Sequence, residues 1–113
     1  FSKYISDVIV IGDQRKYLTA LILIDQENVE KFAQQNRIQY SDFSSLCNSL
    51  EVKKLIAGEV DLVNLKLARV EQVKKFRLID MLLTAEDDEM MATMKLRRSY
   101  CETKYEDLIN SMY

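Results

Sequence analysis

The sequence predicts an α+β fold in which a small β-sheet, including an antiparallel hairpin, packs against helices. Two segments near the N-terminus are rich in β-branched residues, and a short polar connector separates them. Later segments repeat apolar residues at helical spacing, and one more strand-like segment lies among them. Strands and helices in this order are typical of an α+β domain. A chain of 113 residues suits one domain, residues 1–113.

The first strand is predicted over residues 4–11, YISDVIVI, and the second over residues 16–25, KYLTALILID. The connector, residues 12–15, is short and polar, so the two strands are expected to form a hairpin. Both strands are apolar at consecutive positions, which indicates that both faces of the sheet are covered. A further strand is expected over residues 74–80, around Phe76.

Three polar residues are expected to begin helices, because side-chain oxygens of this type accept hydrogen bonds from free amide groups. Asp25 would cap a helix that ends near Asn36, and Ser41 would cap a short helical turn. Ser49 would cap a longer helix over about residues 50–67. The predicted apolar face of this long helix consists of Val52, Leu55, Ile56, Val60, Val63 and Leu67.

Leu62 and Leu65 broaden the apolar face of the long helix, which predicts its deep burial. A last amphipathic helix is expected from about Arg98, with Cys101, Tyr105, Leu108, Ile109 and Met112 on one face. An acidic turn precedes it, made of Glu86, Asp87, Asp88 and Glu89. Carboxylates on a loop usually face water, so no metal site is expected there.

Composition excludes several classes of protein. The formal charge is −2, from 16 cationic and 18 anionic side chains, so no nucleic acid is expected as a partner. The chain has no histidine, which removes histidine bases and histidine metal ligands, and its two glycines are too few for a phosphate-binding glycine loop. Cys47 and Cys101 lie far apart, which favours two free, buried thiols over a disulfide or a zinc site.

The longest apolar runs, VIVIG and LTALILI, are far shorter than the roughly 20 residues that cross a bilayer. No transmembrane segment is therefore expected, and no export signal opens the chain. A cytoplasmic protein is the resulting expectation. Because the chain begins at Phe1 and reaches strand-like sequence at once, it is expected to be a fragment of a longer protein.

Four segments occur in an order that resembles a known family. They are YISDVIVIGDQRKYLTALILID, SLEVKKLIAGEVDLVNLKLARVEQVKKFRLI, TAEDDEMMATMKLRR and KYEDLI. Together they resemble the small C-terminal domain of a long-chain fatty-acid acyl-CoA synthetase, a member of the adenylate-forming, AMP-binding superfamily. The resemblance covers nearly the whole chain, and it rests on the joint order and spacing of the segments.

The resemblance implies a two-step ligase. Such enzymes activate a fatty acid with ATP and Mg²⁺ to an acyl-adenylate and then pass the acyl group to coenzyme A. A large N-terminal AMP-binding domain holds most of the substrate site, and the small domain is a hinged lid over it. This chain alone is therefore expected to be inactive and to bind no cofactor by itself. The resemblance is also compatible with peripheral contact with the inner face of a membrane.

The family places a catalytic lysine in a loop that resembles ELTPTLKLKR, and the matching stretch here is EMMATMKLRR. The match implies that Lys95 is the catalytic residue and suggests Arg97 and Arg98 as contacts for the phosphates of a cofactor or for the partner domain. Two departures bear on this loop. Ala92 replaces a proline that family members usually carry, which is expected to loosen the loop, and Asp88 replaces a common glycine.

Two other functions stay open at this point. The chain could be a non-catalytic interaction module that keeps the fold and docks a partner through the loop around residues 90–94. It could also belong to a related ligase that activates a different acid, because the family selects the acid in its large domain. For Lys95, Arg97 and Arg98 the plain alternative is a solvated basic segment at the start of a helix.

Overall fold

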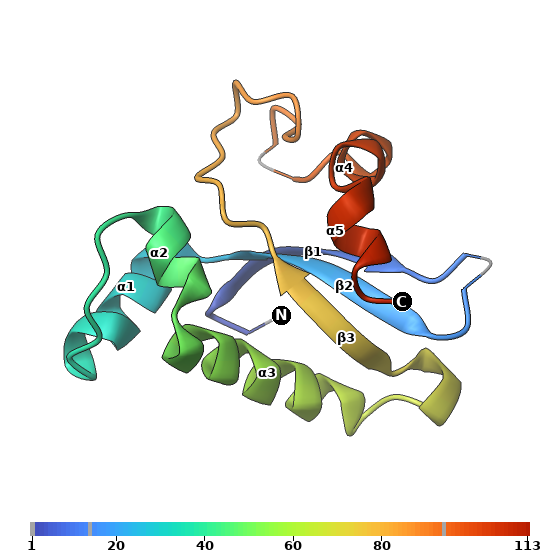
Figure 1. Cartoon of the computed structure of the whole chain (residues 1–113), viewed down its shortest axis with the longest axis horizontal. Coiled ribbons are helices and arrows are strands. Elements are labelled where there is room, and N and C mark those ends of the chain that lie inside the picture. Colours follow the sequence, from blue (N-terminus) through green and yellow to red (C-terminus); the bar gives the residue numbers. More distant parts are fainter. Residues whose placement is uncertain (1, 14, 94) are drawn as a thin grey trace.

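The computed structural model describes residues 2–13, 15–93 and 95–113, and these form a three-stranded sheet with helices on both of its faces (Figure 1). The strands are β1 (Ile5–Ile11), β2 (Leu18–Ile24) and β3 (Val73–Leu78), in the order β1-β2-β3. β1 and β2 pair antiparallel, and β3 pairs parallel to β2. The predicted α+β fold and its hairpin are confirmed.

The hairpin has an irregularity that bears on the candidate site. Its register runs from the pair Ile5 and Ile24 to the pair Ile11 and Thr19, and it shifts between Ile5 and Asp7. Such irregularities bend a strand and change the direction of a side chain. Here Asp7 contacts the loop that follows β3, as described below.

Three helices lie along one face of the sheet: α1 (Gln26–Gln35), α2 (Phe43–Asn48) and α3 (Leu50–Asn64). Asp25 caps α1 through Asn28 N, at 3.0 Å from Asp25 Oδ1, and Ser49 caps α3 through Val52 N. These two predictions are confirmed.

The predicted cap of the short helix α2 is wrong by one residue, because Asp42 replaces Ser41 in this role. Asp42 Oδ1 accepts a hydrogen bond from Ser45 N at 2.8 Å, and Ser45 Oγ accepts one from Asp42 N at 3.0 Å. This reciprocal pair satisfies two free amides at the start of the helix, which a Ser41 cap would not.

The long helix α3 ends at Asn64, before the predicted end at residue 67. The side-chain amide of Asn64 bonds to the backbone of Val73: its Oδ1 accepts from Val73 N and its Nδ2 donates to Val73 O, both at 2.9 Å. This pair joins the end of the helix to the start of β3. The predicted deep burial of Leu62 and Leu65 is wrong, since their exposed fractions are 59% and 81%. The buried residues of α3 are instead Val52 and Ile56, which lie in the core cluster under the sheet.

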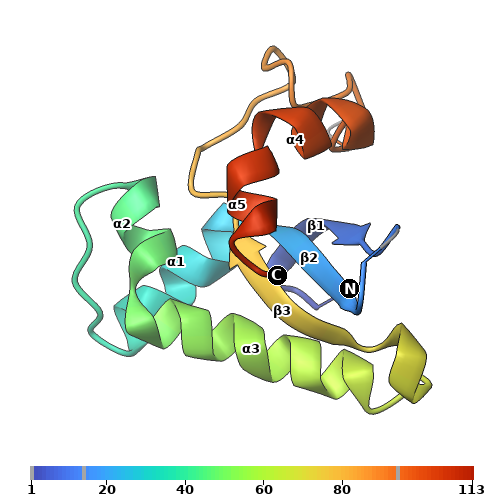
Figure 2. The ribbon, with the colours of Figure 1, turned by 45° about the vertical axis from the view of Figure 1, so that its right-hand side comes forward.

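Helices α4 (Arg98–Lys104) and α5 (Glu106–Asn110) cover the other face of the sheet (Figure 2). They replace the single last helix that was predicted, because the chain bends at Tyr105 between them. The expectation that both faces are covered is confirmed. Cys101 lies in the cluster under α4, and Cys47 lies in the cluster under α2, so both cysteines are free and buried as predicted.

In the part of the chain that the structure describes, no helix combines the length and the apolar character that a bilayer crossing requires.

Candidate functional site

The loop between β3 and α4 carries the predicted catalytic residue and lies on the same side of the sheet as α4 and α5 (Figure 1). Residues 90–93, 95 and 96, near the end of this loop, are called the lysine turn below. Met90 and Leu96 pair as an antiparallel bridge at its base. Met91 N donates a hydrogen bond to Lys95 O at 2.7 Å. Met94 lies outside the described residues.

Lys95 and its neighbour Leu96 are on opposite sides of the chain. Leu96 is buried in the core with Ile9 and Cys101, whereas Lys95 is exposed. Successive side chains of an extended segment alternate in direction, so a buried Leu96 directs Lys95 to the surface. Among residues 2–13, 15–93 and 95–113, no carboxylate forms an ion pair with Lys95. Its ammonium group is therefore available to an external anion.

The backbone at the end of the lysine turn is anchored to β1. Asp7 Oδ2 accepts a hydrogen bond from Leu96 N at 2.8 Å, and Asp7 Oδ1 accepts one from Val8 N at 2.9 Å. A carboxylate acceptor makes this a charge-assisted bond. The residue that follows Lys95 is thus bound directly to the central sheet, although the two segments are far apart in sequence.

The two arginines that follow the lysine turn bind the protein itself. Arg97 Nε donates to Met90 O at 3.0 Å, which closes the base of the turn. Arg98 Nη2 donates to Val10 O at 2.5 Å, and Arg98 Nε forms an ion pair with Glu102 Oε1 at 3.1 Å. Both guanidinium groups therefore have structural contacts. A contact with a cofactor phosphate stays a prediction for each.

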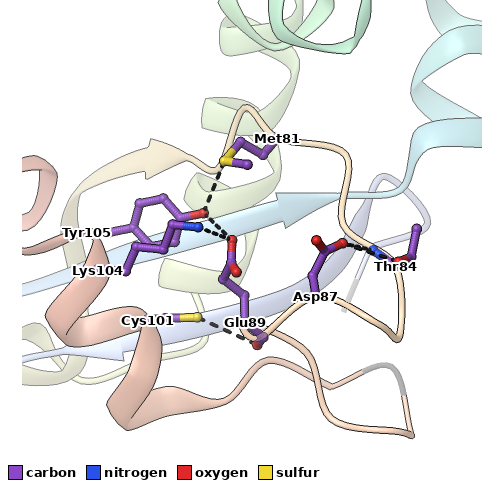
Figure 3. Close-up of polar contacts among 7 residues, drawn as sticks. All are labelled: Met81, Thr84, Asp87, Glu89, Cys101, Lys104 and Tyr105. Carbon is purple, nitrogen blue, oxygen red and sulfur yellow. Dashed lines mark hydrogen bonds and ion pairs between the residues drawn. The ribbon is translucent and has the colours of Figure 1, made fainter.

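A buried carboxylate lies next to the lysine turn, and the sequence did not indicate it (Figure 3). Glu89 is only 3% exposed, so the prediction that it faces water is wrong. Its Oε2 is 2.8 Å from Lys104 Nζ and accepts a hydrogen bond from Tyr105 Oη at 3.1 Å. Lys104 and Tyr105 lie at the end of α4, so the contact joins the loop to that helix.

Burial by itself would raise the pKa of the Glu89 carboxyl. The hydrogen bonds from Lys104, from a backbone amide and from Tyr105, together with the charge of Lys104, more than offset this and hold that pKa below its ordinary value. The hydrogen bond from Lys104 to Glu89 raises the pKa of Lys104 in turn. Burial, then the charge of Glu89, raise the pKa of Tyr105. Glu89 and Lys104 are therefore both charged near neutral pH.

The rest of the acidic turn has a different arrangement. Asp87 Oδ2 accepts hydrogen bonds from Thr84 N at 2.6 Å and from Thr84 Oγ1 at 3.2 Å, so it closes a local turn. Within the described residues, no group of three or more acidic or cysteine side chains could hold a metal ion.

No sequence pattern would have found Glu89. Its partners follow 15 and 16 residues later, and this spacing matches neither a helix nor a strand. In the sequence Glu89 stands between Asp88 and Met90, at the boundary of an acidic and an apolar run, and this position does not distinguish a buried carboxylate from an exposed one. Only the packing of the loop on α4 brings these residues together.

Solved structures of adenylation domains have the same fold. The chain is similar to the adenylation domain of a carboxylate reductase from Mycobacterium chelonae, with a TM-score of 0.67 and 20% identity, over 97% of this chain and 16% of that one. It is also similar to the A-PCP didomain of a carboxylic acid reductase from Segniliparus rugosus in complex with AMP, with a TM-score of 0.66 and 18% identity, over 99% and 14% of the two chains.

The family model for the AMP-binding enzyme C-terminal domain matches residues 1–113, and the chain belongs to this family. A Mycobacterium tuberculosis protein named as a fatty-acid–CoA ligase, fadD11, is 38% identical over 106 residues, which are 94% of this chain and 18% of the relative. Long chain acyl-CoA synthetase 8 of Arabidopsis thaliana is 25% identical over 115 residues, 99% of this chain and 16% of the relative. The chain thus spans less than one fifth of the length of these relatives. The resemblance to the C-terminal domain of acyl-CoA synthetases, stated from the sequence, is confirmed.

Proposed function

We propose that this chain is the C-terminal lid of a long-chain fatty-acid–CoA ligase. The whole protein would activate a fatty acid with ATP to an acyl-adenylate and then transfer the acyl group to coenzyme A. Membership of the AMP-binding C-terminal family supports this proposal, as do relatives named as fatty-acid–CoA ligases and acyl-CoA synthetases. The partner of the lid is a large N-terminal AMP-binding domain of the same polypeptide, and the lid alone is inactive.

Lys95 acts in the first step. A carboxylate oxygen of the fatty acid attacks the α-phosphorus of ATP, and pyrophosphate leaves with the electrons of the broken P–O bond. Negative charge from both reactants concentrates where the new bond forms, so an ammonium group there lowers the barrier. Lysine suits this role as a compact charge on a flexible stem. The observation that carries the proposal is an exposed Lys95 without a carboxylate partner in the described chain, on a turn with an anchored backbone.

Mg²⁺ would neutralise phosphate charge in the same step. The ion would enter with ATP, because Mg²⁺ in such sites is held largely by the phosphates of the substrate and by water. Arg97 and Arg98 could assist at a phosphate only through the donors that their intramolecular contacts leave free. Their roles as cofactor contacts are therefore secondary in this proposal.

The test separates the two half-reactions in the full-length protein. Lys95→Ala should depress fatty-acid-dependent pyrophosphate exchange strongly and leave acyl transfer from preformed acyl-adenylate to coenzyme A nearly unchanged. Lys53→Ala is the matched control, since Lys53 is an exposed lysine on α3, on the other face of the sheet. An equal loss in both half-reactions, or no loss, would contradict the role of Lys95.

The non-catalytic interaction module is less well supported. Its docking surface would be the methionines of the loop, but Met90 is only 2% exposed and belongs to the core. Met91 is 43% exposed, and Met94 lies outside the described residues.

A panel of acids in the exchange assay would distinguish a long-chain ligase from a ligase for another acid. The proposed location is the cytoplasm, with peripheral contact with the inner face of a membrane, and cell fractionation checks it.

A further inference from the structure

Glu89 joins the base of the lysine turn to helix α4 through both its side chain and its backbone (Figure 3). The side chain contacts Lys104 and Tyr105, as described above. Glu89 O accepts a hydrogen bond from Arg97 N at 2.7 Å and one from Cys101 Sγ at 3.8 Å. The residues that immediately precede and follow the lysine turn, Glu89 and Arg97, are therefore bonded to each other, and one of them is bonded to the helix.

A buried carboxylate needs a reason, because removal of a charge from water is costly unless partners compensate for it. A packed apolar residue would fill the same place under α4 without that cost. An apolar residue would not, however, define the distance and direction between the loop and the helix, whereas an ion pair with a second hydrogen bond does. The arrangement favours position over stability.

We propose that Glu89, Lys104 and Tyr105 are positioning residues for Lys95: their contacts hold the lysine turn against α4 and thereby fix where the ammonium group of Lys95 reaches the reactants. This inference rests on the proposed function. Glu89 is buried, whereas Lys95 is exposed, so in this proposal Glu89 does not contact substrate itself. A small displacement of a positioned group reduces a rate strongly, by roughly 100-fold for about 1 Å.

The central test is a double-mutant cycle in the full-length protein. Glu89→Gln keeps the size of the side chain and an acceptor oxygen but removes the charge. It should lower the kcat of fatty-acid-dependent adenylation by about 10- to 100-fold, with the KM for ATP nearly unchanged and acyl transfer from preformed acyl-adenylate intact. In the Lys95→Ala background the same substitution should lower adenylation no further, because the residue that it positions is gone.

A second measurement does not depend on activity. Hydrogen exchange of the Met91 and Leu96 amides reports opening of the lysine turn, since both amides are bonded there. Exchange at both should accelerate in Glu89→Gln and, to a smaller extent, in Tyr105→Phe, which keeps the ring and loses one hydrogen bond. Glu27→Gln is the matched control, because it breaks an exposed ion pair with Lys31 on the other side of the sheet and should change neither readout.

The outcomes separate this inference from the function on which it rests. If Lys95→Ala leaves adenylation intact, the proposed function fails, whatever the exchange data show. If Lys95→Ala abolishes adenylation but Glu89→Gln lowers the rate equally in both backgrounds, Glu89 does not act through Lys95 and the inference is overturned. Unchanged exchange at Met91 and Leu96 in both Glu89→Gln and Tyr105→Phe would also overturn it.

Discussion

Replacement of Asp7 by alanine should open the lysine turn without disturbing the hairpin that carries Asp7. The substitution removes the carboxylate oxygen that accepts the hydrogen bond of Leu96 N at 2.8 Å. It also removes the bond of the other oxygen to Val8 N, but this one is local, between adjacent residues. Leu96 itself is buried, so its amide would lose a partner that water cannot readily replace.

The magnitude follows from the type of bond. A hydrogen bond to a charged group contributes about 1.5–3 kcal/mol, and the partial exposure of Asp7 reduces this to about 1–2 kcal/mol. A change of this size corresponds to a factor of roughly 5–30 in the population of the open turn. Hydrogen exchange at the Leu96 amide should accelerate by the same factor, while exchange at amides of β2 stays unchanged.

Two controls make this experiment decisive. Asp7→Asn keeps an acceptor oxygen and should accelerate exchange much less than Asp7→Ala. Asp13→Ala removes an exposed carboxylate from the connector of the same hairpin and should have no effect at Leu96. If all three variants exchange alike, the contact with Asp7 does not anchor the turn, and Lys95 is not positioned by β1.

Three further results are expected. The pKa of Glu89 lies below its ordinary value of 4.5, so its charge stabilises the fold above pH 4.5, and this contribution disappears as the pH falls through the folded pKa. The difference in unfolding free energy between wild type and Glu89→Gln should therefore shrink below about pH 4.5, as measured by urea titrations. Ala92→Pro should raise the unfolding free energy by about 0.4–1 kcal/mol, because proline restricts the unfolded state and Ala92 N donates no backbone hydrogen bond within the described chain. A loss of stability would show that the turn cannot accept proline. Leu65→Ser should change the unfolding free energy by less than about 0.5 kcal/mol, whereas Ile56→Ala should lower it by about 2–5 kcal/mol. Thermal unfolding measures both, and an equal loss in the two variants would show that Leu65 contributes to stability despite its exposure.

Local patterns predicted the strands and most helix starts because these depend on neighbouring residues. The β-branched runs gave β1 and β2, and Asp25 and Ser49 are caps as expected. The end of α3 could not be predicted in this way. It depends on the bond between Asn64 and Val73, which forms only when β3 is in place. Helical periodicity continues through Leu65 in the sequence, although the helix does not.

The candidate site divides along the same line. The position of Lys95 in the chain followed from a resemblance, and its exposure agrees with the role that the resemblance implies. The residues that hold its turn were out of reach, because they come from three separate segments: Asp7 from β1, Glu89 from the loop and Lys104 from α4. The arginines illustrate the reverse error. A cation beside a candidate lysine suggests a phosphate contact, but Arg97 Nε binds a backbone carbonyl of the same loop.

The free charge and the contacts that position it are therefore carried by different residues in this domain. Lys95 is exposed and makes no ion pair within the described chain, so its replacement should leave the fold intact. Asp7 and Glu89 make contacts that anchor the lysine turn, so their replacement should loosen this turn and, under the proposed function, displace the ammonium group of Lys95. Under the proposed function, a lid that places one charge against a substrate on another domain would need this separation. In that role the Lys95 side chain would stay free at its tip, so the accuracy of its placement would depend on the backbone below it.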